Sequence, residues 1–181
     1  LRIQIKIHAA IDTVYQALTT SAALETWLAE SAAVDLKAGH FSYWGKYTPA
    51  NPSKDSQHMT LIEHKPNRLL KFTWQIRDDA TTVTIKLRER DEQTTVLTLI
   101  HEKGGMLHHQ EDTFTLEDYW FLNLENLRRY IDGKPSEARV NFSQPMNGNI
   151  RHILDSDATP EELYAVLTQP ELIEKWIASK A

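Results

Sequence analysis

The sequence contains no cysteine, which excludes disulfide bonds, thiolate nucleophiles and cysteine-based zinc sites. It has no apolar run long enough to span a membrane and no recognisable signal peptide, so we expect no membrane partner and a cytoplasmic location. Its 20 basic residues are outnumbered by 25 acidic ones, which gives a net charge of −5. That balance argues against a nucleic-acid partner, because nucleic-acid-binding domains concentrate positive charge.

A repeat is the most informative feature that the sequence contains. The pattern of residues 9–29 returns at residues 158–178, with a constant offset of 149 residues. The identical pairs include Ala9/Ala158, Tyr15/Tyr164, Leu18/Leu167, Thr19/Thr168, Trp27/Trp176 and Ala29/Ala178. This period matches one ordinary domain rather than a solenoid repeat. It predicts a complete domain at 1–147, with a core at 1–133 and a linker at 134–147, followed by the truncated start of a second copy at 148–181.

The partial second copy is expected to consist of a strand and two short helices. Its apolar residues, among them Leu163, Tyr164 and Leu167, would lack the sheet and the long helix that cover the corresponding face in a complete copy. An uncovered apolar face of this kind marks an interaction site. We therefore expect it to pack on the first domain or to form a homodimer through residues 150–178.

Hydrophobic periodicity predicts the order of elements in the first domain as one strand, two short helices, six strands and one long helix. Ile3, Ile5 and Ile7 alternate with polar residues, as in a strand with one buried face. The long helix has apolar residues spaced three or four apart, namely Leu116, Trp120, Leu124, Leu127 and Ile131. The resulting α+β fold is a curved antiparallel sheet covered by the long helix, with an apolar cavity between them.

Five stretches, in this order, resemble a known family: residues 11–19 with Trp27, 65–69 with 72–74, 82–85, 94–101 and 119–133. They resemble the START-related helix-grip (SRPBCC) superfamily and, within it, the domain type named for the activator of heat shock protein 90 ATPase (AHSA-type). The resemblance implies the helix-grip fold, a curved antiparallel sheet wrapped around a long C-terminal helix, with two short helices after the first strand. It also implies two kinds of partner, because superfamily members bind small hydrophobic molecules and the name-giving members bind a heat shock protein 90-type chaperone.

The favoured hypothesis is non-enzymatic binding of a small hydrophobic ligand in the cavity between sheet and helix. The residues expected to line this cavity are Trp27, Tyr43, Phe72, Trp74, Ile85, Leu87, Leu97, Leu99, His101, Trp120 and Leu124. The simpler alternative is that these side chains pack a solid core, as large aromatics usually do. Two other functions stay open, a chaperone-associated interaction module and a cyclase- or hydrolase-type enzyme.

No motif predicts a catalytic centre, a cofactor or a metal. Glu63, Glu102 and Asp112 are candidate acids or bases, but their spacing places no pair together. A histidine-rich stretch at 108–112 follows His101 and Glu102, yet it lacks the helical spacing of a metal site, and a solvated loop explains it better. His101 itself is expected either as a polar group of the cavity or as a hydrogen-bonded histidine at a strand end.

Overall fold

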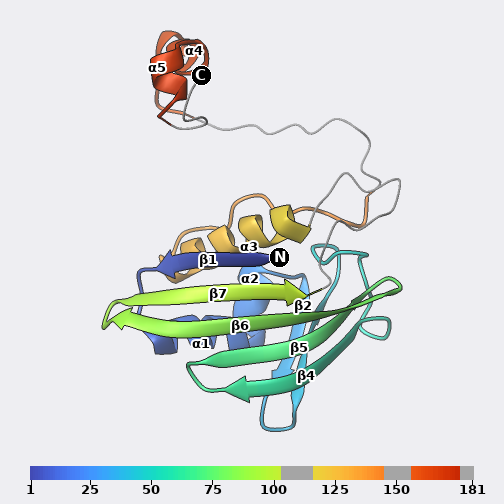
Figure 1. Ribbon diagram of the computed structural model, residues 1–181. Coiled ribbons are helices and arrows are strands. Elements are labelled where there is room, and N and C mark those ends of the chain that lie inside the picture. The colour runs from blue at the N-terminus through green and yellow to red at the C-terminus, as the bar shows by residue number, and fades with distance from the viewer. Residues whose placement is uncertain (103–115, 145–155, 176–181) are drawn as a thin grey trace. The chain divides into compact units, whose positions relative to one another are not determined.

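The computed structural model describes residues 1–102, 116–144 and 156–175 and divides the chain into two compact units, residues 1–147 and 148–181 (Figure 1). The first unit has the predicted order of elements, and its α+β fold is confirmed. Its helices are α1 (Ile11–Thr19), α2 (Ser21–Trp27) and α3 (Leu116–Ile131). Its strands are β1 (Arg2–Ile7), β2 (Ser31–Asp35), β3 (His40–Trp44), β4 (His58–Lys65), β5 (Leu69–Ile76), β6 (Asp79–Asp91) and β7 (Thr94–Glu102).

The strands form two antiparallel sheets. Five of them pair in the order β1-β7-β6-β5-β4, so the first strand of the chain lies beside the last strand of the unit. Among the described residues, β2 and β3 pair only with each other, and β3 packs beside β4 without a hydrogen-bonded ladder between them. The sequence had indicated one continuous sheet. The chain between β3 and β4 instead leaves the strand direction at Gly45, whose φ of +100° suits glycine.

One face of the five-stranded sheet forms the core. Alternate residues of β5, Leu70, Phe72, Trp74 and Ile76, are all buried on this face, as their period-two spacing predicts. Helices α1 and α2 lie behind the sheet in the view of Figure 1, and α3 runs beside β1. The predicted stripe of α3 is buried from Leu116 to Leu127, and Tyr119 and Asn126 are buried with it. The helix therefore contacts the rest of the unit over a wider face than its sequence stripe suggests.

Residues 134–144, expected to be a linker, pack against earlier residues of the first unit. Phe142 donates its backbone N–H to the carbonyl oxygen of Lys46 at 2.7 Å. The guanidinium of Arg139 lies 4.0 Å from the ring centroid of Tyr47 and donates to the carbonyl oxygen of Ala29 at 3.2 Å. Polar composition had indicated a linker, but a cation–π contact and backbone hydrogen bonds attach this segment to the domain.

The second unit is described from residue 156 to 175 and contains α4 (Pro160–Thr168) and α5 (Pro170–Ile173). Thr159 and Glu162 form a complete capping box at the start of α4, as the sequence indicates. None of the residues of α4 or α5 is buried. The strand expected at the start of this unit lies outside the described residues, as does Trp176.

Candidate functional site

Large buried side chains pack the described part of the space between the sheet and the helices. A gap described there has a volume of about 10 Å³ and is lined by Leu18, Leu24, Trp27, Leu28, Phe41, Tyr43, Leu70, Phe72, Ile85 and Trp120. A cavity needs roughly 10–15 Å³ to hold one water, and small-molecule pockets reach roughly 300–1,000 Å³. This gap therefore has room for one water at most.

All eleven residues predicted to line a cavity are buried. Five of them line the small gap, Trp27, Tyr43, Phe72, Ile85 and Trp120. The other six, Trp74, Leu87, Leu97, Leu99, His101 and Leu124, belong to the surrounding core. The gap also includes residues that the prediction omitted, such as Leu24 and Phe41. Edge-to-face packing, for example between Tyr43 and Trp74 with centroids 5.5 Å apart, fills much of the volume.

His101 is a hydrogen-bonded core histidine. Its Nδ1 accepts a hydrogen bond of 3.0 Å from Nε1 of Trp120. Indole Nε1 can only donate, so the imidazole carries its proton on Nε2 and donates it to Oγ1 of Thr81 at 2.8 Å. Thr81 in turn donates to the carbonyl oxygen of Trp74 at 2.6 Å. Burial lowers the pKa of His101 to about 4, so the ring is neutral at physiological pH.

The two buried tyrosines nearest to this network also stay in one protonation state. Burial raises the pKa of Tyr43 well above its usual value, and burial raises that of Tyr119 as well. Both hydroxyls are therefore neutral at physiological pH. With His101 neutral too, none of these three groups is poised to exchange a proton near pH 7.

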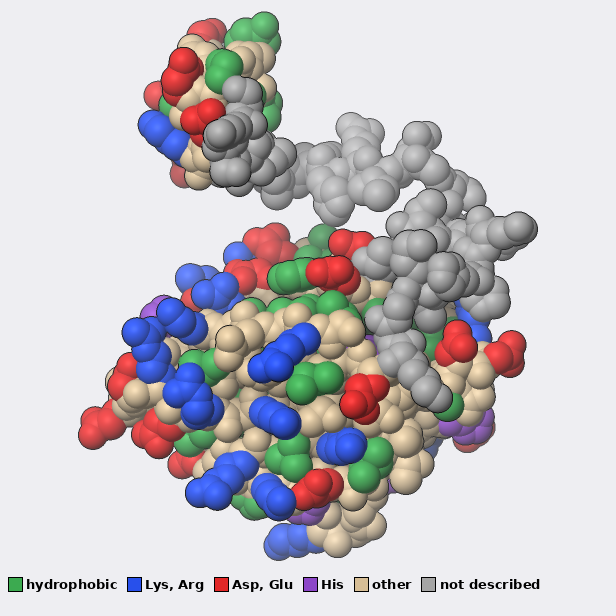
Figure 2. All heavy atoms as spheres, viewed as in Figure 1, with side chains coloured by type: hydrophobic (Ala, Val, Ile, Leu, Met, Phe, Trp, Pro, Cys, Tyr) green, Lys and Arg blue, Asp and Glu red, His purple; other side chains and the backbone are tan. Residues whose placement is uncertain are grey.

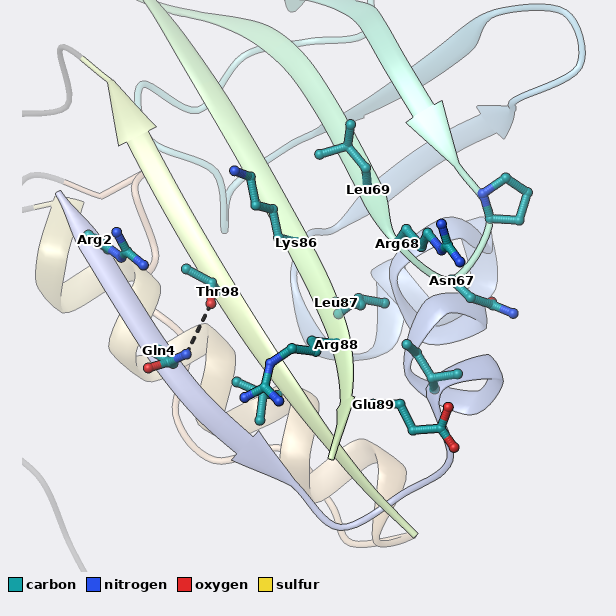
Figure 3. Close-up of a pocket in the computed structure, with 13 residues that line it drawn as sticks. Arg2, Gln4, Asn67, Arg68, Leu69, Lys86, Leu87, Arg88, Glu89 and Thr98 are labelled. Carbon is teal, nitrogen blue, oxygen red and sulfur yellow. Dashed lines mark hydrogen bonds between the residues drawn. The ribbon is translucent and has the colours of Figure 1, made fainter. Parts of the chain in front are cut away.

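A larger hollow lies on the opposite, outer face of the sheet. This outer groove has a volume of about 970 Å³ and is lined by Arg2, Gln4, Ile11, Pro66, Asn67, Arg68, Leu69, Lys86, Leu87, Arg88, Glu89, Val96 and Thr98. It crosses β1, β7 and β6 and ends at the turn between β4 and β5 (Figure 3). Asn67, in a left-handed conformation with φ of +58°, shapes this turn and donates a hydrogen bond to Asp12 of α1.

Positive charge dominates the outer groove, although the whole chain is acidic. Four cationic side chains line it, Arg2, Arg68, Lys86 and Arg88, and Glu89 is the one carboxylate among the lining residues. All five side chains are exposed. Figure 2 shows Lys and Arg side chains spread over this face of the sheet. The net charge of −5 had hidden this concentration, because it averages over every face of the molecule.

Local sequence patterns indicate part of this groove. Alternation places Arg2 and Gln4 on the polar face of their strand, and Lys86 and Arg88 on that of theirs. The two pairs of residues lie along the same groove because β1 pairs with β7, with Arg2 opposite Ile100. That pairing joins segments almost a hundred residues apart, so local patterns could not predict it.

The described residues contain no cluster of three or more metal-ligating side chains. Glu63, one of the candidate acids, forms an exposed ion pair of 2.8 Å with Lys65, which lowers the pKa of Glu63. Asp112 and the histidine-rich stretch at 108–112 lie outside the described residues. Over the same described ranges, no helix combines the length and apolarity needed to cross a bilayer.

Comparison with known proteins decides the family. Residues 8–132 match the family model described as activator of Hsp90 ATPase homolog 1-like protein, AHSA1, which covers more than half of the chain. The chain belongs to the AHSA1 family. The resemblance drawn from the sequence is thereby confirmed, whereas none of the curated proteins matches the chain in sequence.

Solved structures of AHSA1-like proteins share the helix-grip fold. An HSP90 activator from Plasmodium falciparum is 22% identical over 76% of this chain and 98% of its own, with a TM-score of 0.56. CalU16 from Micromonospora echinospora is 20% identical over 98% of this chain and 85% of its own, with a TM-score of 0.54. The Aha1 dimer from Colwellia psychrerythraea is 17% identical over 72% of this chain and 94% of its own, with a TM-score of 0.51. At these identities the likeness concerns the fold alone.

Proposed function

We propose that this AHSA1-family protein is a non-enzymatic interaction module that binds a heat shock protein 90-type chaperone. The observation that carries the proposal is the family match over residues 8–132, and the gap of about 10 Å³ described between sheet and helices is too small to hold a ligand as it stands. The neutral state of His101, Tyr43 and Tyr119 supports a binding role over an acid–base one. The family match and the fold of an HSP90 activator from Plasmodium falciparum support the choice of partner.

The test is a titration of the full chain into a purified heat shock protein 90-type chaperone, read by calorimetry and by the ATPase rate of the chaperone. We expect saturable binding and a raised ATPase rate. A chain unfolded by heating and returned to the assay serves as the control for bulk effects. Absence of both heat and rate change at a tenfold excess of the chain would refute the proposal.

A small hydrophobic ligand is the second candidate function. Its support is the concentration of large aromatics around one gap, where Trp27, Tyr43, Phe72 and Trp120 meet. A ligand would enter by separating α3 from the sheet, since the gap as it stands is too small. Native mass spectrometry of the protein as purified tests this function. An additional mass that is lost on unfolding supports it, and a bare chain argues against it.

We further propose that the second unit mediates a homodimer through residues 150–178. Apolar side chains on α4 are exposed, including Leu163 at 40%, Tyr164 at 71% and Leu167 at 60%. Exposed apolar patches often mark interaction sites. Sedimentation velocity over a range of concentrations tests the proposal, with Leu167→Glu as the disrupting variant and Thr168→Glu as the matched control. A monomer at every concentration would overturn it.

A further inference from the structure

We propose that the outer groove binds an acidic linear segment of a partner protein. Four cations line it against the single carboxylate of Glu89. Arg2, Arg68, Lys86 and Arg88 take part in no ion pair within residues 1–102, 116–144 and 156–175. Like charges gathered on one face repel each other, and an anionic ligand relieves that repulsion.

The spread of the cations favours an extended segment over a small anion. Arg2 lies level with Ile100 on β7, and Ile100 lies level with Thr84 on β6, four residues before Arg88. Two strand spacings and four residues along a strand separate the backbones of Arg2 and Arg88 by about 16 Å. Figure 3 shows the two side chains well apart in the groove. An extended chain of about five residues spans this distance, whereas one phosphate group does not.

The groove also offers apolar contacts to such a segment. Ile11 and Leu69, which are half-buried, are among its lining residues. Val96 is only 5% exposed although it lies on the outer face, between its register partners Lys6 and Arg88. Long basic side chains cover apolar surface with their alkyl stems while their charged ends stay in water. The groove therefore suits a segment in which acidic and apolar residues alternate.

The shape of this surface favours a peptide over a membrane or a nucleic acid. The groove is a hollow of about 970 Å³, which a flat bilayer surface does not fill. Its lining residues include no aromatic side chain on which a base would stack. This inference goes beyond the chaperone proposal, because an acidic segment of any other protein would fit the same groove.

Fluorescence anisotropy of a labelled octapeptide of alternating Asp/Glu and Leu, titrated with the full chain, tests the inference. The double variant Lys86→Thr/Arg88→Thr removes two groove cations and keeps residues that favour strands. We expect roughly tenfold weaker binding, because two charge contacts are lost at a solvent-exposed site. Glu89→Gln removes the opposing charge, so we expect roughly threefold tighter binding. Raising the salt from 50 to 500 mM should weaken the wild-type complex, since Debye screening reaches about 10 Å at 0.1 M.

The matched control is Lys37→Thr/Lys54→Thr, which removes the same charge from two exposed lysines outside the groove. Circular dichroism verifies that each variant is folded. The inference is overturned if the control loses as much affinity as the groove variant, or if an Asn/Gln version of the peptide binds equally well. Displacement of the peptide by equimolar inorganic pyrophosphate would also overturn it, in favour of a small-anion site.

Discussion

Helices α1 and α4 have nearly the same pattern of residues and very different surroundings. Each has nine residues, and the boundaries of α4 repeat those of α1 at the offset of 149 residues. In α1, Val14, Ala17 and Leu18 are buried. In α4 no residue is buried, and Leu167, the counterpart of Leu18, is 60% exposed. The local sequence thus sets where each helix begins and ends, while the sheet and α3 of the first unit supply the burial.

The two helices also differ in how their first turns are stabilised. The N-cap of α1 is Ala10, which offers no side-chain hydrogen bond. The N-cap of α4 is Thr159, which forms a capping box with Glu162 and is followed by Pro160. Short helices are marginal in water without tertiary contacts. Packing therefore stabilises α1, and local capping has a larger share in stabilising α4.

Truncating one leucine in α1 and its counterpart in α4 should give the largest difference between the two helices, measured as the loss in the free energy of unfolding. Leu18→Ala removes a side chain that is 2% exposed, so we expect a loss of about 2–5 kcal/mol in the free energy of unfolding. Leu167→Ala at the matched position should change it by less than about 0.5 kcal/mol at protein concentrations low enough for the chain to be monomeric. Urea unfolding followed by tryptophan fluorescence measures both, because four of the five tryptophans lie in residues 1–147. A comparable loss in the two variants would mean that α4 is covered in solution.

Acid should lower the stability of the first unit more than that of residues 156–175. The first unit holds a buried titrating group, and residues 156–175 contain no histidine. Burial lowers the pKa of His101 to about 4 in the folded protein, below the value near 6.5 of an unfolded chain. The unfolded state therefore binds this proton first as the pH falls. The contribution of His101 to stability is complete above about pH 6.5 and is lost progressively toward pH 4, by at most about 3 kcal/mol.

Urea unfolding at pH 7.5, 6 and 5 measures this dependence. His101→Asn should lower stability at every pH and flatten its decrease with acid, because the titrating group is absent. His58→Asn, at an exposed histidine, is the control and should leave the slope as in the wild type. An unchanged slope in His101→Asn would show that other groups cause the acid sensitivity.

How much of this structure the sequence could predict depends on the range of the interactions involved. The order of elements and the buried face of β5 follow from local periodicity. The capping box of α4 is also readable, since Thr159 and Glu162 stand three residues apart. His101 was recognised as a candidate, but its partners Thr81 and Trp120 come from other segments, and only the fold brings them within hydrogen-bond distance.

The candidate site shows the same limit more strongly. A cavity was expected because a helix on a curved sheet leaves space, yet its volume depends on how rings such as Tyr43 and Trp74 interlock. The amino-acid composition shows how many aromatic residues the chain contains, but it does not determine how their rings pack. The outer groove was missed because Arg2 and Arg88 meet only through the register of β1, β7 and β6. Net charge cannot report a cluster whose members are this far apart in the sequence.

The smallest effect is expected from the cap of α4. Thr159→Ala removes the side-chain acceptor of the 3.2 Å hydrogen bond from the Glu162 backbone N–H, a loss of about 1 kcal/mol for the helix. Amide hydrogen exchange over residues 156–175 should then become roughly fivefold faster, while exchange in the first unit stays unchanged. Thr168→Ala, at the last residue of the same helix, removes no cap and is the matched control. If exchange in α4 were unchanged by Thr159→Ala, contacts beyond its own sequence would have to stabilise it, and the contrast with α1 would not hold.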